Sequence, residues 1–245
     1  MKYIGSKAKL AKYIVPILQG YIKDNKIKTY IEPFVGGFNI IDKIDCENRV
    51  ATDIDPLVID LVDDCLNNPH LLDLLSDAPT REHYYDVRDN AWRYQSWYRA
   101  AILLFASYNA RVYGGCYGAT ATTKDGATRN YFEEAKNNFK RQLPDLHGIL
   151  LGCGGYTETT PPKSRALIYC DPPYAEGIGY GKDFDTDAFW QWCRERSAEG
   201  HIVIISEYAA PSDFDCIWQH DIVTHLNNRN KIAKVERLFI YGGAK

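Results

Sequence analysis

The chain has 245 residues, of which 45% are hydrophobic, and its formal net charge is −3. This length fits one α/β domain with an insertion, or one and a half domains, and the composition is ordinary for a globular protein. No apolar stretch approaches the ~20 residues that a membrane span needs, and the first residues lack the apolar region of a signal peptide. We therefore expect no membrane partner and a cytoplasmic location.

The cysteines indicate the redox state of the compartment. There are seven of them, scattered along the chain and without a C-x-x-C pair. An odd, unpaired set predicts free thiols in a reducing compartment rather than a disulfide framework or a zinc site. We therefore expect no bound metal.

The first part of the chain predicts two helices and two strands. Residues 6–22 carry apolar side chains at helical spacing, and Pro16 is expected to kink this helix. Residues 28–31 and 49–52 predict short strands, and a helix is expected over residues 56–66, because proline is favoured in a first helical turn.

The rest of the chain changes character twice. Residues 68–148 are mostly helical in pattern, apart from residues 113–118, whose glycines indicate a loop or hairpin. Strand patterns then return at residues 166–170, 201–206 and 235–241, with a helix over about 186–198.

Strands that alternate with helices on both sides of a helical stretch predict the fold class. We expect an α/β fold with a doubly wound, mostly parallel sheet and a mainly helical insertion. The predicted domains are residues 1–56 with 149–245, which form the sheet domain, and residues 57–148, which form the insert.

The charge is unevenly distributed. Residues 81–141 hold 10 Lys and Arg against 6 Asp and Glu, whereas the segments on either side are acidic. The same stretch contains Trp92, Arg93, Tyr94, Trp97, Tyr98 and Arg99. Basic and aromatic residues together suit phosphate contact and base stacking, although a half-buried helix face with solvated arginines is an equal alternative.

The turn after the first strand predicts a ligand site. Gly36 and Gly37 let the backbone turn sharply and approach a ligand closely, but the segment is not a phosphate-binding loop. Asp53 ends the second strand about 20 residues later, where an acid hydrogen-bonds ribose in nucleotide-binding folds; the alternative is an acid at a helix N-terminus. A nucleoside without phosphates fits best, and S-adenosylmethionine is the common one.

Asp171-Pro172-Pro173-Tyr174 is the most specific motif. It follows the buried run 166–170, so the carboxylate is expected at the C-terminal end of a strand, where open α/β sheets bind ligands. The prolines stiffen the turn. A carboxylate, a rigid carbonyl and an aromatic ring suit the binding of a flat base by its exocyclic amine, whereas the alternative is an ordinary strand-ending turn.

These motifs resemble those of the Dam-like DNA adenine methyltransferases, in which a cofactor motif, a recognition insert and a catalytic motif follow one another. The resemblance lies in residues 2–7, 32–37, 171–174 and 205–208, with Tyr180 and Phe184. It implies a Rossmann-like methyltransferase sheet. It also implies transfer of a methyl group from S-adenosylmethionine to the 6-amino group of an adenine flipped out of double-stranded DNA, in a restriction-modification or phage system.

The resemblance also implies roles for individual residues. The implied catalytic residues are Asp171, Pro172, Pro173 and Tyr174. The implied cofactor-binding residues are Tyr3, Lys7, Glu32, Pro33, Phe34, Gly36, Gly37, Asp53, Ile54, Tyr156, Asp171 and Tyr180. For Tyr156, a tyrosine packed on the sheet edge is the alternative.

The segment that touches DNA in the family has the pattern Tyr-Asn-Gly-Leu-x-Arg. Tyr108 and Asn109 match it, whereas Ala110, Arg111 and Tyr113 replace the glycine, leucine and arginine. The resemblance therefore implies that Tyr108, Asn109, Arg111 and Tyr113 bind DNA, while the GATC target of the family does not carry over. Other readings of the chain are methylation of the 4-amino group of cytosine, methylation of a protein glutamine amide, and a catalytically silent DNA-binding protein.

Overall fold

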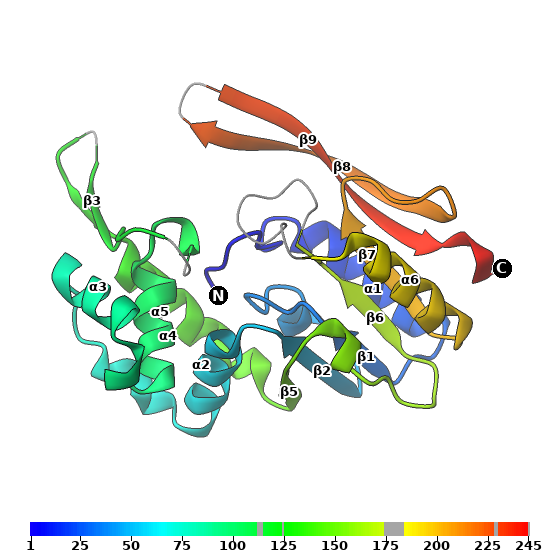
Figure 1. Ribbon diagram of the computed structural model, residues 1–245, viewed down its shortest axis with the longest axis horizontal. Coiled ribbons are helices and arrows are strands. Elements are labelled where there is room, and N and C mark those ends of the chain that lie inside the picture. The colour runs from blue at the N-terminus through cyan, green and yellow to red at the C-terminus, as the bar shows by residue number, and fades with distance from the viewer. Residues whose placement is uncertain (112–114, 124, 174–183, 228–229, 245) are drawn as a thin grey trace. The chain divides into compact units, whose positions relative to one another are not determined.

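The computed structural model describes residues 1–111, 115–123, 125–173, 184–227 and 230–244 (Figure 1). The chain divides into two compact units. The first unit comprises Met1–Gln19, Val35–Asp45 and Ala51–Gly154, and the second comprises Gly20–Phe34, Cys46–Val50 and Gly155–Lys245.

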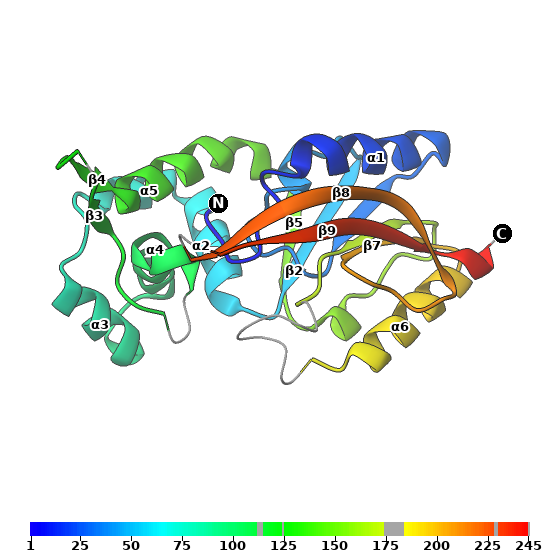
Figure 2. The same cartoon turned by 90° about the horizontal axis from the view of Figure 1, so that it is seen from above.

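The second unit is built on a twisted sheet. Its strands follow the order β1 (Thr29–Glu32), β6 (Leu167–Cys170), β7 (Ile202–Glu207), β9 (Asn230–Tyr241) and β8 (Phe214–Asn227). The first three are parallel, with Ile31 beside Ile168 and Ile168 beside Val203. The last two form an antiparallel hairpin whose strands run side by side along their length (Figure 2). The mostly parallel sheet confirms the predicted fold class.

Helices lie on both faces of this sheet (Figure 2). On one face, α6 (Thr186–Ala198) buries Phe189, Trp190 and Cys193 against Ile168, Cys170, Val203 and Ile205. The side chain of Asp185 caps this helix by accepting from the backbone nitrogen of Ala188 at 2.9 Å. The other face receives the last turns of α1 (Ala11–Asp24), which contains Pro16 and begins five residues later than predicted.

The first unit contains a bundle of four helices. They are α2 (Pro56–Asn67), α3 (Arg81–Asp89), α4 (Ser96–Ala106) and α5 (Tyr131–Gln142). Every residue of α4 from Ala100 to Ala106 is buried, as expected of a helix at the centre of a bundle. Helix α2 begins at Pro56 as predicted, and Asp55 caps it by accepting from the nitrogen of Leu57 at 3.1 Å.

The same unit contains β5 (Ile149–Cys153) and the end of β2 (Asn48–Asp53), where the nitrogen of Gly154 donates to the carbonyl of Asp53 at 2.9 Å. Short 3-10 helices complete the described chain. They are Ile41–Lys43, Pro69–Leu74, Ala91–Arg93, Tyr108–Ala110, Leu143–Leu146, Tyr156–Glu158 and Gly242–Ala244.

Two hairpins and the strand β5 differ from the expectation, since no strand was expected at Ile149–Cys153. The mainly helical insert contains the antiparallel pair β3 (Thr120–Thr122) and β4 (Thr128–Asn130), which has no buried face and therefore no apolar alternation to detect. Its turn contains Asp125 and Gly126, and Gly126 has a φ of +83°. The strand β8 also escaped prediction, because a bulge between Cys216 and Trp218 interrupts its two-residue period.

Candidate active site

The proline-rich motif lies where it was expected. Asp171, Pro172 and Pro173 directly follow the C-terminal end of β6, and Pro172 is buried while its two neighbours are half-buried. Because β1 runs parallel to β6, Glu32 ends its strand at the same edge of the sheet. Tyr174 and Tyr180 lie outside the described residues.

Next to this edge is a stack of aromatic rings. Phe34 and Tyr156 face each other with their centroids 5.5 Å apart and their planes 27° apart. Both pack against the buried core that contains Ile168 and Cys170, the strand residues just before Asp171. The structure therefore brings together two predicted cofactor contacts that are 122 positions apart in the sequence. A half-buried pair of rings offers a flat, apolar surface of the kind that a purine ring covers.

Glu32 is a buried carboxylate with an internal partner. Only 3% of its surface is exposed, and its Oε1 accepts from the hydroxyl of Tyr30 at 2.6 Å. Pro33 is also buried. Glu32 and Pro33 thus lie at the packed end of β1 rather than in an exposed loop.

The first unit holds the other predicted cofactor contacts, centred on Asp53. The Oδ2 atom of Asp53 accepts from the nitrogen of Gly36 at 2.8 Å, and its Oδ1 accepts from the nitrogen of Asp55 at 2.9 Å. Burial raises the pKa of Asp53 to about 6, against the opposing effect of these hydrogen bonds. The alternative for Asp53 was an acid at the helix N-terminus, but Asp55 caps that helix. Ile54, between them, is 71% exposed.

The glycine pair is required by close packing. A Cβ on Gly36, whose φ is +47°, would lie 2.8 Å from the ring of Tyr3, and one on Gly37 would lie 2.8 Å from the carbonyl of Met1. Contacts this short would force the neighbours to move. Lys7 is buried, and its ammonium group donates to the carbonyl of Gly5 at 3.4 Å.

Gln142 also holds this turn and was missed by the sequence analysis. It ends α5, and its amide donates to the carbonyl of Phe38 at 2.9 Å and to that of Gly37 at 3.3 Å. It donates as well to the carboxylate of Asp42 at 2.9 Å. A single glutamine in a polar helix carries no sequence signal for contacts made more than 100 positions away.

The predicted DNA-binding segment lies after α4. Tyr108 is 62% exposed, and Arg111 is also exposed. Tyr113 and the side chain of Asn109 lie outside the part of the chain that the structure describes. Ala110 has a φ of +55°, a left-handed conformation that favours glycine. This explains why the resembled pattern has glycine at the position that Ala110 takes here.

The aromatic and basic stretch of the insert divides into two groups. Trp97 is buried, and Tyr94 stacks on Tyr98 with ring centroids 5.9 Å apart. Trp92, by contrast, is 84% exposed, and the guanidinium of Arg93 lies 5.7 Å from its ring. The packing alternative thus holds for the first group, while Trp92 remains available to a ligand.

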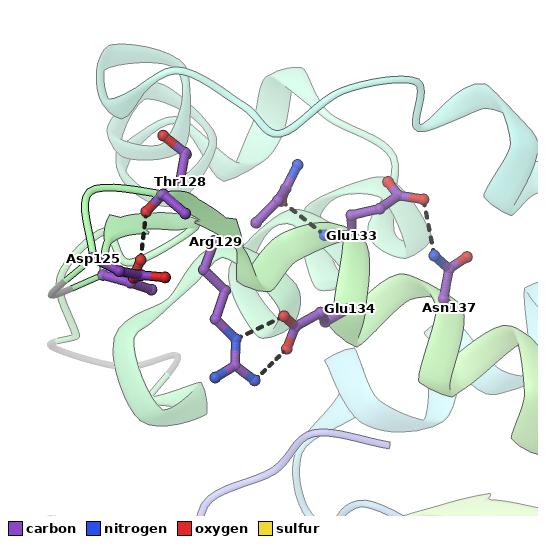
Figure 3. A pocket seen from close by; sticks show the side chains of 9 residues that line it. Asp125, Thr128, Arg129, Glu133, Glu134 and Asn137 are labelled. Carbon is purple, nitrogen blue, oxygen red and sulfur yellow. Dashed lines mark hydrogen bonds and ion pairs between the residues drawn. The ribbon is translucent and has the colours of Figure 1, made fainter.

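A hollow of about 470 Å³ lies beside the β3–β4 hairpin (Figure 3). Its lining includes the carboxylates of Asp125, Glu133 and Glu134, and Arg129 is bound by Glu134 through two hydrogen bonds of 2.7 and 2.9 Å. An acidic hollow whose arginine is already paired does not suit a phosphate group. The contacts instead brace the hairpin against the start of α5.

Two further properties concern cofactors and membranes. Among the described residues, no cluster of three or more His, Cys, Asp or Glu side chains has an arrangement that holds a metal ion. In the same part of the chain, no helix has the length and apolar character for a membrane span. The strand-end carboxylate, the stiff turn and the aromatic stack place the chain in a class: α/β proteins with a candidate ligand site at the carboxyl edge of the sheet.

The family follows from comparison with known proteins. The model of the D12 class N6 adenine-specific DNA methyltransferases matches residues 3–237. The chain therefore belongs to this family, and it is an adenine-specific DNA methyltransferase. The resemblance inferred from the motifs is confirmed, and the family does not support the cytosine, glutamine and catalytically silent alternatives.

Named relatives agree with this assignment. The type II methyltransferase M.MjaIII of Methanocaldococcus jannaschii is 25% identical over 200 residues, which span 71% of this chain and 68% of that protein. The type II methyltransferase M.FokI of Planomicrobium okeanokoites is 35% identical over 63 residues, which span 26% of this chain and only 9% of that protein.

Two solved structures show more distant similarity. A putative RNA methyltransferase from Pyrococcus horikoshii is 9% identical with a TM-score of 0.40, over 92% of this chain and 80% of that one. A putative methyltransferase from Escherichia coli is 6% identical with a TM-score of 0.37, over 94% of this chain and 85% of that one.

Proposed function

We propose that the chain transfers a methyl group from S-adenosylmethionine to the 6-amino group of an adenine flipped out of double-stranded DNA. The observation that carries the proposal is the position of Asp171 and Pro172, at the end of β6 and beside the Phe34–Tyr156 stack. Membership of the N6 adenine-specific family indicates that the base is adenine and that the methylated atom is its 6-amino nitrogen.

The chemistry needs acceptors rather than a strong base. The adenine amine is a poor nucleophile because its lone pair is delocalised into the ring, and positive charge grows on its nitrogen as the methyl group arrives. Asp171 accepts one N–H and the carbonyl of Pro172 accepts the other, so that the lone pair points away from the ring plane. Such fixed acceptors stabilise the developing charge without reorganising, and the stiff turn supplies the orientation.

The residues present fit S-adenosylmethionine. The stacked rings of Phe34 and Tyr156 suit its adenine, and the buried carboxylate of Glu32 suits a hydrogen-bond donor of the ligand. When bound, S-adenosylmethionine supplies an electrophilic methyl group on a positively charged sulfur. We also assign Tyr3, Lys7, Gly36, Gly37, Asp53 and Ile54 to contacts with S-adenosylmethionine, as the family resemblance implies.

The DNA contacts are assigned to the insert. A base inside a duplex hides its amine, so the target adenine has to leave the stack at a cost of a few kcal/mol. Tyr174 is assigned to stack on the extruded base, which is worth about 1–3 kcal/mol. Tyr108 and Arg111 are assigned to contact the duplex, and their exposure supports this.

The domain boundaries and setting are part of the same proposal. Residues 57–148 form the recognition insert, and residues 1–56 with 149–245 form the catalytic domain. The four-helix bundle formed by α2, α3, α4 and α5 supports a separate role for the insert. The seven free cysteines support a reducing compartment such as the cytoplasm.

Replacing Asp171 with alanine tests the proposal. Because the amine then loses a charged acceptor, methylation should fall about 100-fold or more, while the fold and much of the affinity for S-adenosylmethionine are retained. Labelled S-adenosylmethionine and unmethylated duplex DNA are incubated with each protein, and the DNA is digested to nucleosides. The wild type should place the label in 6-methyladenine, and sequencing of the product gives the target site.

Asp24→Ala is the matched control, because Asp24 is an exposed carboxylate at the end of α1 in the same unit. It should methylate as fast as the wild type. Label in methylcytosine, or an Asp171→Ala variant with wild-type turnover, would overturn the assignment.

A further inference from the structure

The hydroxyl group of Tyr169 is an unusual feature of the second unit. Tyr169 is 2% exposed, and its oxygen has no hydrogen bond of ordinary geometry among the described residues, although the Ser206 hydroxyl lies close enough to lower its pKa. A buried hydroxyl without a partner is unfavourable, and each such group in a native protein calls for an explanation. Tyr169 lies in β6, two residues before Asp171.

The neighbouring strand shows what such a tyrosine does elsewhere in this chain. On β1, Tyr30 lies two residues before Glu32 and donates to its carboxylate at 2.6 Å. Residues two apart in a strand point to the same face, so the bond is a local one. Strand β6 repeats this arrangement beside it, with Tyr169 followed by Asp171. Asp171 directly follows the end of β6, and its side chain is one methylene shorter than that of glutamate, so the second pair has a shorter reach.

Another carboxylate near Tyr169 already has its own donor. Glu236 on β9 is 2% exposed, and its Oε1 accepts from the hydroxyl of Ser206 on β7 at 2.8 Å. With Glu32 matched to Tyr30, each of these two buried acids has a hydroxyl donor. The carboxylate that corresponds to Tyr169 in the same pattern is Asp171.

Electrostatics agree with this proximity. Burial raises the pKa of the Tyr169 hydroxyl well above its usual range, and the charge of Asp171 is the next largest cause. Glu32 and Glu236 add to the rise, whereas the Ser206 hydroxyl opposes it. The phenol is therefore protonated at neutral pH and is a hydrogen-bond donor among acceptors.

We infer that Tyr169 is a positioning residue for Asp171: its hydroxyl donates to the carboxylate when that carboxylate turns to accept the N–H of the substrate amine. The inference rests on the proposed function. In apo structures, catalytic hydrogen bonds are often long and tighten only in the reacting complex. The bond would hold one oxygen of Asp171, leave the other directed at the amine, and favour the ionised form of the carboxylate.

Replacing Tyr169 with phenylalanine removes the hydroxyl alone. Turnover should fall about tenfold at neutral pH, with a change of less than twofold in the Kd for S-adenosylmethionine measured without DNA. The melting temperature should stay the same or rise, because an unpaired buried hydroxyl has been removed. If Tyr169 had only a structural role, its replacement would instead lower both the melting temperature and the affinity for S-adenosylmethionine.

The pH profile is a second readout. Without the Tyr169 donor the pKa of Asp171 rises, so the acid limb of the turnover profile should move to higher pH. The other titratable groups facing this cluster in the second unit are unchanged by the variant; they are Tyr30, Glu32, Cys170, Cys193 and Glu236.

Tyr84→Phe is the matched control. Tyr84 lies in α3, is fully buried, and has a hydroxyl without a hydrogen-bond partner among the described residues. Its loss should affect stability in the same direction and leave turnover unchanged. Tyr169→Phe with turnover within twofold of the wild type at every pH would overturn the inference. A wild type that does not label adenine would overturn the proposed function instead.

Discussion

At the scale of single residues, Asp53 shows how a buried carboxylate can serve the backbone. Both of its oxygens accept backbone N–H groups, one from the glycine turn and one from the residue that caps α2. Burial nevertheless dominates and raises its pKa from 3.8 to about 6. A carboxyl group whose pKa is higher in the folded than in the unfolded state stabilises the fold most when protonated, and that contribution is lost as the pH rises through the folded pKa.

This linkage predicts a pH effect on stability. Because of Asp53, the free energy of unfolding should fall by about 2 kcal/mol between roughly pH 4 and pH 7. In Asp53→Asn the amide oxygen still accepts a hydrogen bond but does not ionise, so this part of the pH dependence should disappear. Urea unfolding of both proteins at the two pH values measures the difference. Equal pH dependence in the two proteins would contradict the shift.

Local patterns identify some of these residues and not others. Asp171 follows an apolar run and precedes two prolines, so a few consecutive residues are enough to predict its position at a strand end. The unpaired hydroxyl of Tyr169, the buried Ser206–Glu236 pair and the contacts of Gln142 depend on strand register or on long-range packing. The residues adjacent in sequence do not predict such contacts.

At the scale of elements, the segment around Tyr108 is held by the residues that follow the undescribed positions 112–114. The nitrogen of Tyr108 donates to the carbonyl of Cys116 at 2.8 Å, and the nitrogen of Gly118 donates to that of Ala106 at 2.8 Å. A Cβ on Gly118 would lie 2.9 Å from the Cα of Tyr108. The backbone of the proposed DNA-binding segment therefore depends on a glycine.

The same substitution at two glycines should have opposite effects. Gly118→Ala should lower the free energy of unfolding by about 1–3 kcal/mol, because backbone atoms have to move apart, and it should weaken DNA binding. Gly20→Ala, inside α1 with open space around it, should raise that free energy by about 0.5–1 kcal/mol. Chemical denaturation measures both, and a stabilising Gly118→Ala would contradict the packing described for Tyr108.

Whether a helix or strand can be predicted from this sequence depends on how much of it is buried. The strands β6 and β7 are buried on both faces and contain apolar runs, and Pro56 marks the start of α2. The hairpin of β3 and β4 is exposed, so nothing in its composition distinguishes it from a loop. Strands that are buried along their length are thus predictable from one sequence, whereas the exposed hairpin of β3 and β4 and the bulged strand β8 are not.

At the scale of the whole molecule, the charge distribution predicts how DNA binding responds to salt. Residues 81–141 are basic although the chain is acidic overall. Removal of a phosphate contact by Arg111→Ala should weaken DNA binding and reduce the slope of log affinity against log salt by about 1. Titrations of duplex DNA at several salt concentrations provide the slope.

Lys23→Ala provides the control, since Lys23 is an exposed cation in the last turn of α1 and lies outside the insert. It should leave the slope unchanged. If both variants changed the slope equally, the effect would come from net charge rather than from a contact made by Arg111.

The bulge in β8 also bears on behaviour in concentrated solution. This 14-residue strand ends the order of the sheet, and an edge of that length is a template onto which a strand of another molecule can add. The extra residue between Cys216 and Trp218 breaks the even spacing of donors and acceptors that such templating requires. We therefore expect this irregularity to make the addition of a strand at the β8 edge less favourable.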